Sequence, residues 1–273
     1  MKADRVITLT LLGLTRSLGR ALVAEHVARQ RGLLQSLDPR VRVAGLLVLV
    51  LAATLSHRIG VILWLFCVAT VIALLSKVNI STLVTRVWLV ALLFTGVIAL
   101  PALFLTPGDP IFVVPDGTTH MTAQGVSTVL LLIARVETAV TLTTLLVLCT
   151  PWIQVLKALR AFYVPKEVVM MLAMTHRYIF VLAETASQMF ESRQSRTVGV
   201  QAGRGQRLTA TRTAGVLLSK SLEISNDVYL AMQSRGFRGD VKILTKFHMR
   251  TWDYAGLLAL LGGAGLAVWL GRT

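Results

Sequence analysis

Charged residues are scarce in this chain, and acidic residues are the scarcest of all. Of 273 residues only 15% are charged, with 13 Asp or Glu against 28 Lys or Arg, whereas 55% are hydrophobic. A soluble domain typically carries about 25% charged residues, so the composition excludes that class. Together with a mean hydropathy of +0.70, it indicates a protein that crosses a membrane several times.

Cysteine is nearly absent, and the histidines form no cluster. Cys67 and Cys149 both lie in apolar runs, which excludes a disulfide framework and a cysteine-based metal cage. We expect both to be small core hydrophobic residues. The histidines lack the spacing of a metal site, so a metal, if the protein carries one, is expected to be bound elsewhere; they are His26, His57, His120, His176 and His248.

Several functional motifs are also missing. The chain has no Gly-x-x-x-x-Gly-Lys-Ser/Thr loop, so it is not itself a P-loop ATPase; Gly203-Arg204-Gly205 is interpreted as a flexible loop. No convergent acid, base or metal ligands indicate a membrane enzyme. A self-contained secondary transporter stays open as one functional class. Such transporters often have repeated halves and interrupted helices, whereas this chain shows no internal repeat and only the single break at Pro101.

Five apolar runs are candidates for membrane-spanning helices, which need about 17 to 25 residues. Asp38 and Pro39 mark the start of the first, because Asp caps free amides and proline suits the first helical position. The first and last runs are short unless they include flanking residues. The runs are Val41–Leu55, Ile59–Leu75, Val87–Leu105, Val126–Cys149 and Ala255–Leu270.

The distribution of basic residues predicts the orientation. Residues 1–42 contain eight Lys or Arg and residues 151–250 contain fifteen, whereas residues 106–125 contain none. Basic loops stay in the cytoplasm, so we expect the N-terminus inside, the C-terminus outside, and the basic region 151–250 inside. The net charge of +15 is therefore assigned to cytoplasmic loops, and nucleic acid is not expected as a partner.

The N-terminal segment is expected to remain on the protein. Val6 to Leu14 is a short, threonine-interrupted apolar run followed by arginines, without the cleavage site of a signal peptide. Arg5, Arg16 and Arg20 share one helical face. An amphipathic helix on the cytoplasmic membrane surface and a solvated helix both fit this pattern.

The region 151–250 is predicted to form cytoplasmic amphipathic helices, bent at Pro165. Beyond Ser187 the chain turns polar, and a helical pattern resumes over Ser219–Met232. Gly236 and Gly239 are good helix terminators, which places Arg235 at a helix C-terminus. We predict four parts: residues 1–40 as a cytoplasmic amphipathic N-terminal segment, 41–150 as four spans, 151–250 as a region of cytoplasmic helices, and 251–273 as the last span.

Arg135 and Glu137 lie well inside the fourth predicted span. Ionisable groups at this depth are often functional, although a structural contact in the bundle interior is at least as common. Because they are two residues apart, they point to different faces and are not expected to pair.

Several motifs, taken in order, resemble a known family. They are Leu37-Asp38-Pro39-Arg40, Cys149-Thr150-Pro151, Val155–Leu159, Val164-Pro165, Thr175–Glu184 and Ala231–Phe237. This ordered set resembles the transmembrane T component of energy-coupling-factor (ECF) transporters, most closely its cobalt/nickel branch. The resemblance implies an all-α polytopic membrane helix bundle with cytoplasmic coupling helices, in a prokaryotic cytoplasmic membrane.

The resemblance also implies partners and contact residues. Two coupling helices of such proteins end in a small-Arg-small motif that docks onto ABC ATPase subunits. Here these would be Ser195-Arg196-Thr197, which departs from the usual glycine at Thr197, and Ser234-Arg235-Gly236. The ATPases would bind ATP and Mg, a separate substrate-binding (S) subunit would bind cobalt or nickel, and this chain would be non-catalytic and without cofactor. A T component serving a vitamin is the alternative within the family.

Overall fold

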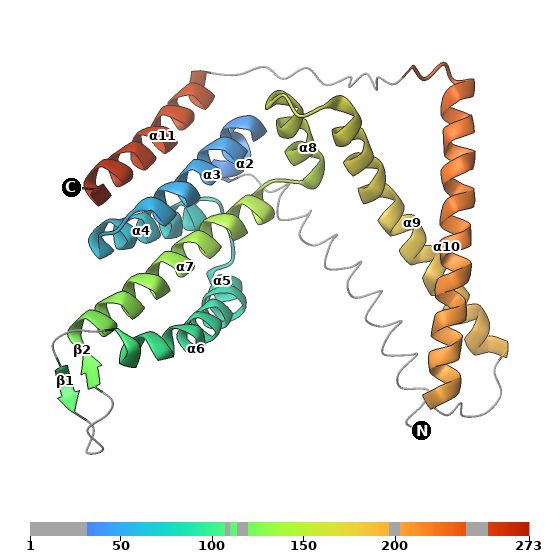
Figure 1. Ribbon diagram of the computed structural model, residues 1–273. Coiled ribbons are helices and arrows are strands. Elements are labelled where there is room, and N and C mark those ends of the chain that lie inside the picture. Colours follow the sequence, from blue (N-terminus) through green and yellow to red (C-terminus); the bar gives the residue numbers. More distant parts are fainter. Residues whose placement is uncertain (1–31, 107–109, 114–119, 197–202, 239–250, 273) are drawn as a thin grey trace. The chain divides into compact units, whose positions relative to one another are not determined.

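The computed structural model describes residues 32–106, 110–113, 120–196, 203–238 and 251–272 (Figure 1). The chain divides into two compact units, one formed by Glu25–Ala158 and Phe247–Thr273, the other by Met1–Ala24 and Leu159–Lys246. The described part is helical apart from one short hairpin, so the predicted class, an all-α polytopic bundle, is confirmed. The four predicted domain boundaries stay predictions.

The first unit, called the bundle below, contains most of the elements. Its helices and strands are α2 (Leu33–Ser36), α3 (Pro39–Leu55), α4 (Ile59–Leu75), α5 (Ile80–Leu83), the π-helix η1 (Val84–Trp88), α6 (Leu89–Leu105), β1 (Pro110–Val113), β2 (His120–Thr122), α7 (Ala123–Cys149) and α11 (Thr251–Arg272). Helix α8 (Trp152–Ala161) follows α7, and the second unit contains α9 (Lys166–Arg196) and α10 (Gly203–Ser234).

Local signals explain the start of α3. The Asp38 side chain accepts a hydrogen bond from the Arg40 amide at 2.9 Å, and Pro39 occupies the first helical turn. The cap satisfies one of the amides that a helix start leaves free. The predicted helix start at Asp38 and Pro39 is therefore confirmed.

The core of the bundle lies among α3, α4, α7 and α11. Leu46, Leu65 and Leu145 contribute fully buried side chains from the first three of these helices. A Cβ atom added to Gly45 would meet the Leu260 side chain at 2.4 Å, so α3 and α11 approach closely where α3 has no side chain. Small residues are the usual means of such contact between membrane helices.

Four of the five predicted spans each lie within one helix of the bundle, and Val87–Leu105 comprises the end of η1 and all of α6. By length and composition, Ala123–Cys149 and Thr251–Gly271 can cross a membrane, and Ile59–Leu75 and Leu89–Leu103 are shorter apolar helices. Lys166–Arg193 in α9 also meets the length and composition criterion, although the sequence placed it in the cytoplasm. The several apolar helices are those of a multi-pass membrane protein.

Two expectations about proline are corrected. Pro101 does not break its span, because α6 continues through it to Leu105; neighbouring helices make such prolines tolerable in membrane helices. The chain also does not bend within one long helix at Pro165. Instead α8 ends at Ala161 and α9 begins at Lys166, after a turn in which Tyr163 has a φ of 61°.

Two further expectations are corrected. Helix α10 begins at Gly203, well before Ser219, so Gly203-Arg204-Gly205 forms its first turn and not a flexible loop. Polar residues such as Arg and Gln are good helix formers, so the polar composition did not prevent a helix. Cys149 is buried as expected, but Cys67 is exposed on the surface of the bundle. The predicted N-terminal amphipathic segment lies in residues 1–31, outside the described residues.

Candidate coupling site

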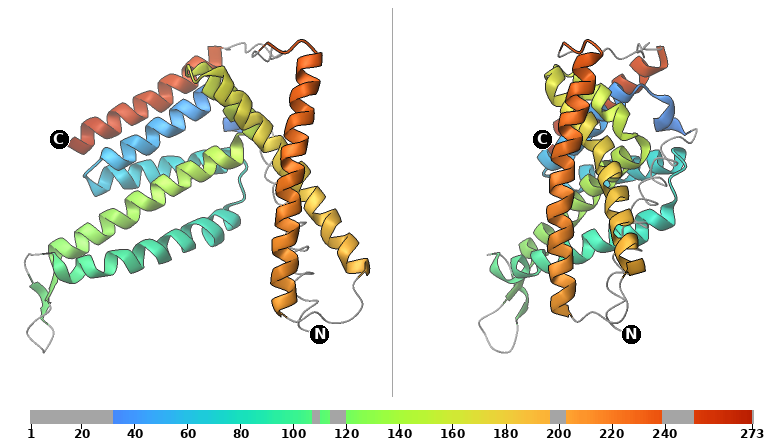
Figure 2. Two further views of the ribbon diagram at one scale, coloured as in Figure 1. Left: turned by 45° about the vertical axis from the view of Figure 1, so that its right-hand side comes forward. Right: turned by 90° about the vertical axis from the view of Figure 1, so that its right-hand side faces the viewer.

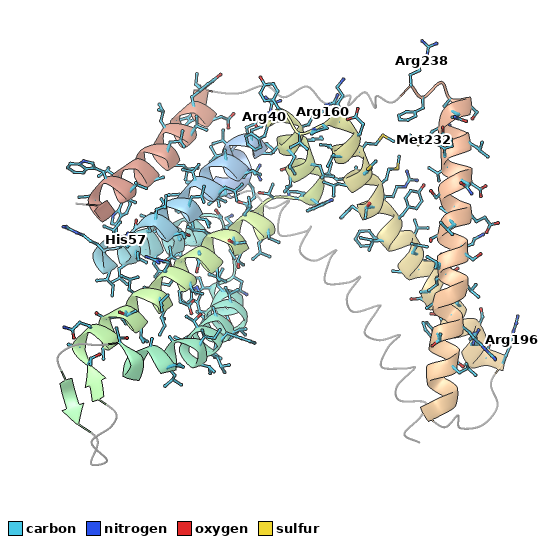
Figure 3. The ribbon with its side chains drawn as sticks, viewed as in Figure 1. Arg40, His57, Arg160, Arg196, Met232 and Arg238 are labelled. Atoms are coloured by element: carbon cyan, nitrogen blue, oxygen red, sulfur yellow. The ribbon has the colours of Figure 1, made fainter. Side chains whose placement is uncertain are left out.

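Helices α9 and α10 pack against each other and run in opposite directions, as the two views of Figure 2 show. Small side chains are among their most buried residues: Ala186 and Ser187 on α9 and Thr213 on α10. Figure 3 labels Arg196 at one end of this pair and Met232 towards the other. The C-terminal ends of α9 and α10 therefore lie at opposite ends of the α9–α10 pair.

The end of α10 is a Schellman turn centred on Arg235. The Phe237 amide donates to the Met232 carbonyl at 3.0 Å, and the Gly236 amide donates to the Gln233 carbonyl at 2.9 Å. Gly236 has a φ of +78°, the left-handed conformation that this turn requires and that glycine adopts at little cost. The prediction that Arg235 and Gly236 end a helix is confirmed, and Arg235 is exposed.

The end of α9 shares with α10 a serine contact and an exposed arginine. Arg196 is its last residue and is exposed. The Ser195 hydroxyl donates to the Ser192 carbonyl at 3.0 Å, and the Ser234 hydroxyl donates to the Ala231 carbonyl at the same distance. In both motifs the serine thus folds back onto its own helix beside an exposed arginine. Thr197, the third residue of the first motif, lies outside the described residues.

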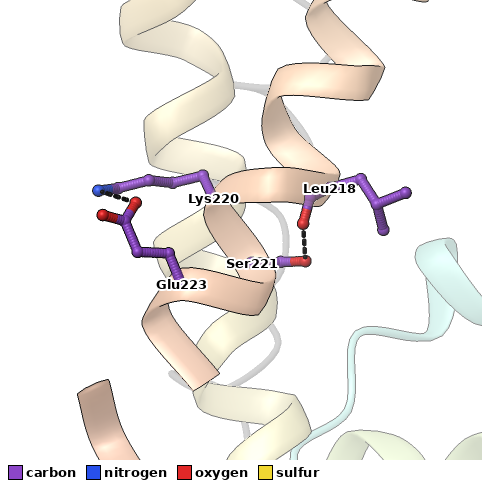
Figure 4. Close-up of polar contacts among 4 residues, drawn as sticks. All are labelled: Leu218, Lys220, Ser221 and Glu223. Atoms are coloured by element: carbon purple, nitrogen blue, oxygen red, sulfur yellow. Dashed lines mark hydrogen bonds and ion pairs between the residues drawn. The ribbon is translucent and has the colours of Figure 1, made fainter. Parts of the chain in front are cut away.

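Two charged residues in the middle of α10 pair with each other within the helix. Lys220 donates to Glu223 at 2.9 Å, and the Ser221 hydroxyl donates to the Leu218 carbonyl at 2.8 Å (Figure 4). The hydrogen bond to the Glu223 carboxylate raises the pKa of Lys220. This exposed pair is satisfied within one helix, and such pairs contribute little to stability.

An apolar groove lies between α9 and α10 and extends to the Arg235 turn. Its volume is about 430 Å³. Met170, Met174 and Tyr178 line it from α9, and Met232 and Phe237 line it from the end of α10. Because Met232 and Phe237 also form the Schellman turn, the groove and the exposed Arg235 belong to one local structure.

Arg135 and Glu137 have separate surroundings within α7. Arg135 donates from Nη2 to the Ser56 carbonyl at 2.7 Å, at the end of α3. Glu137 is 8% exposed, and both its carboxyl oxygens are buried without a hydrogen-bond partner among the described residues. The two side chains do not pair with each other in the described structure, as the sequence predicted.

Sequence reasoning missed a buried polar cluster at the C-terminal end of α7. It placed Arg42 in the first span and counted it among the basic residues of the cytoplasmic side, yet Arg42 is 3% exposed and donates to the Cys149 carbonyl at 2.8 Å. Asp253 at the start of α11 is also buried and accepts from the Asp38 amide at 2.8 Å. The available signal was a charged residue directly after Val41 in a membrane-length apolar run.

The described residues contain no group of three or more His, Cys, Asp or Glu that could hold a metal ion. This observation covers only the described residues. Metal binding by another subunit stays a prediction. His26, His120 and His248 have no described side chains.

Comparison with known proteins decides the family. The model of a family described as the CbiQ cobalt transport protein matches residues 30–246. The chain belongs to the CbiQ family. The resemblance to the cobalt branch of T components is thereby confirmed, and the chain is a membrane component of the cobalt transport type.

Two known proteins are similar to this chain over most of its length. The cobalt transport protein CbiQ of Rhodobacter capsulatus is 27% identical over 177 residues, covering 64% of this chain and 72% of that protein. An uncharacterised protein of Methanocaldococcus jannaschii, MJ1571, is 28% identical over 258 residues, covering 93% of this chain and 88% of that protein. The similarity to MJ1571 therefore extends over nearly the whole chain.

Proposed function

We propose that this chain is the transmembrane scaffold of an ECF-type ABC importer that takes up cobalt or nickel ions. It couples ATP hydrolysis by separate ATPase subunits, which bind ATP and Mg, to uptake by a separate substrate-binding membrane subunit. The chain itself is non-catalytic and carries no cofactor. Its CbiQ membership supports the transport class and the metal substrate.

The observation that carries this proposal is the placement of Arg196 and Arg235. Both are exposed, both lie at a helix C-terminus, and the two ends are at opposite ends of the α9–α10 pair (Figure 3). A helix of the length of α10, 32 residues, spans about 48 Å. One ATPase subunit therefore contacts one arginine, and each planar guanidinium binds carboxylates or carbonyls of its own subunit.

The proposed orientation follows from the loop charges. The N-terminus and the α9–α10 pair are cytoplasmic and the C-terminus is outside, because basic segments remain in the cytoplasm. Although Lys166–Arg193 has the length and composition of a span, Arg196 must face the cytoplasm to meet an ATPase. External labelling of a single cysteine at Gln201 in intact cells would contradict this orientation.

The proposal is tested by pull-down with tagged ATPase subunits co-expressed with this chain. Alanine at Arg235 or Arg196 is expected to weaken ATPase association at least about thirtyfold, as for about 2 kcal/mol of lost charge-assisted contact. The double variant should lose more, because the two contacts are separate. The Arg235→Lys variant should associate better than Arg235→Ala but less well than the wild type, since lysine keeps the charge but lacks the planar guanidinium with its several donors.

A matched control is Arg212→Ala, which removes an exposed arginine from α10 away from its end. We expect this variant to bind the ATPases like the wild type, and all variants to unfold within about 0.5 kcal/mol of it. Normal association and Co²⁺ uptake by the Arg196→Ala/Arg235→Ala protein would refute the coupling role. Co²⁺ uptake by the chain alone would instead favour a self-contained transporter.

A further inference from the structure

Arg42 connects the beginning of α3 to the end of α7. Its Nη1 donates to the Cys149 carbonyl at 2.8 Å. Its Nε and Nη2 donate to the Leu37 carbonyl at 2.9 Å and 2.7 Å, and Nη2 also reaches the Gln35 carbonyl at 3.1 Å. The buried guanidinium thus fixes the last residue of α7 to the turn between α2 and α3.

The same turn is bonded to the start of α11. The Asp38 amide donates to Oδ1 of Asp253 at 2.8 Å, and both aspartates are buried. Their negative charges act on the Arg42 guanidinium, which offsets part of the cost of burying it. Asp38, Arg42 and Asp253 are called the Arg42 cluster below.

The Arg42 cluster lies where the chain leaves the bundle and where it returns. Cys149 ends α7, and α8 follows it on the way to α9. Asp253 is in the first turn of α11, the first described helix after α10. Along the chain, these two connections join the α9–α10 pair to α7 and α11 of the bundle.

We propose that the Arg42 cluster transmits movement of the α9–α10 pair to the bundle, with Arg42 as the positioning residue. This inference rests on the proposed function. A packed helix deforms little, and the hydrogen bonds of Arg42 tie a displacement at the end of α7 to the turn between α2 and α3. The guanidinium suits this task because its rigid fork bonds several carbonyls at once.

Arg135, in the middle of α7, provides a matched control at the other end of α3. Its Nη2 bonds to the Ser56 carbonyl, the C-cap of α3. Helices α3 and α7 thus each receive an arginine from the other at their C-terminal end, where a cation is favourable. Only the Arg42 end continues into α8, so only Arg42 lies on the route to the α9–α10 pair.

The test uses the whole complex, with ATPase and substrate-binding subunits, in vesicles. Radioactive Co²⁺ uptake and ATP hydrolysis are measured together for Arg42→Lys and Arg135→Lys. We expect Arg42→Lys to bind the ATPases normally but to lower uptake per ATP hydrolysed about tenfold, within the range that single positions on a coupling route change. Arg135→Lys should keep the wild-type ratio.

A second measurement is independent of substrate. A spin label on Ala255, exposed on α11 beside Asp253, reports movement when ATP is added; exposed Cys67 is first replaced by serine, whereas buried Cys149 stays. The ATP-induced change should vanish in Arg42→Lys and persist in Arg135→Lys. If Arg42→Lys does not fold, Asp253→Asn removes one charge of the cluster and should lower the ratio about threefold.

The outcomes separate this inference from the proposed function. A wild-type ratio and a retained label response in Arg42→Lys, or in Asp253→Asn where Arg42→Lys does not fold, overturn the role of the Arg42 cluster alone. Equal losses in Arg42→Lys and Arg135→Lys also overturn it, because they show general loosening of the bundle. Normal ATPase association by the Arg196→Ala/Arg235→Ala protein overturns the proposed function instead.

Discussion

The arginines of the bundle and those of the α9–α10 pair occupy similar places but differ in what they bind. Arg42 and Arg135 each donate to the carbonyl at the end of a neighbouring helix. Arg196 and Arg235 lie at the ends of their own helices and are exposed. Arg42 and Arg135 donate to carbonyls inside the bundle, whereas Arg196 and Arg235 carry exposed guanidinium groups that another protein can reach. The first kind fixes the bundle and the second suits a subunit interface.

Among the described residues, the α9–α10 pair has no core comparable to that of the bundle; its most buried apolar side chains are those of Val169 and Ala186. Leu46, Leu65 and Leu145 of the bundle are at most 1% exposed. On the α9–α10 pair, Ile179 is 57% and Leu222 62% exposed. Two helices alone cannot bury both of their apolar faces, so the pair has surface available for partners that the bundle core has not.

The largest expected effect concerns what Arg42 and Arg135 contribute to the stability of the bundle. Arg42→Ala leaves three carbonyls of the bundle without their donor and should lower the free energy of unfolding by about 3 kcal/mol. Arg135→Ala removes one such hydrogen bond and should cost about 1 kcal/mol. Unfolding in detergent, followed by circular dichroism, checks both; equal losses would contradict the different use of the two arginines.

A smaller effect is expected at the turn that holds Arg235. Gly236→Ala meets no atom within 4 Å but must adopt a φ of +78°, which costs about 1 kcal/mol for a residue with a Cβ. ATPase association should therefore weaken. Gly215→Ala, also without an atom within 4 Å but inside α10, should stabilise the helix by about 1 kcal/mol. Stronger binding by Gly236→Ala would show that the left-handed turn is not needed.

A substitution at Glu137 tests the cost of a buried carboxyl group in the bundle, because no described contact is lost with it. Glu137→Gln keeps the shape of the side chain, whose carboxyl oxygens have no described partner. The variant should be as stable as the wild type or more stable by up to about 1 kcal/mol, because an ionisable group in a membrane interior is costly. A clear loss of stability in the same unfolding experiment would reveal a partner that requires the carboxylate.

The smallest effect is expected for Lys220→Met on the exposed face of α10. Because Glu223 raises the pKa of Lys220, the contribution of this pair is present below the pKa of unfolded lysine. It is lost as the pH rises through the higher folded pKa. Since the pair is exposed, ATPase association at neutral pH should equal that of the wild type. Weakened binding would add Lys220 to the interface.

Local signals in the sequence determined much of the helix pattern and the helix end at Arg235. Ile59–Leu75 was predicted with its observed bounds, Asp38 and Pro39 start α3, and Gly236 ends the turn after α10. Each of these features depends on residues within a turn or on an uninterrupted apolar run. Propensity over the polar residues after Gly203 was too weak a signal, and the start of α10 was therefore missed.

The sequence by itself established a multi-pass helical membrane protein of the CbiQ type with arginines at two helix ends. Only the tertiary structure decided which other arginines are buried and what they bind. Arg42 and Cys149 are 107 residues apart, and Asp38 and Asp253 are 215 apart. Such partners are chosen by how helices pack, since a carbonyl at a helix end has no local donor and accepts from whichever side chain the neighbouring helix brings to it.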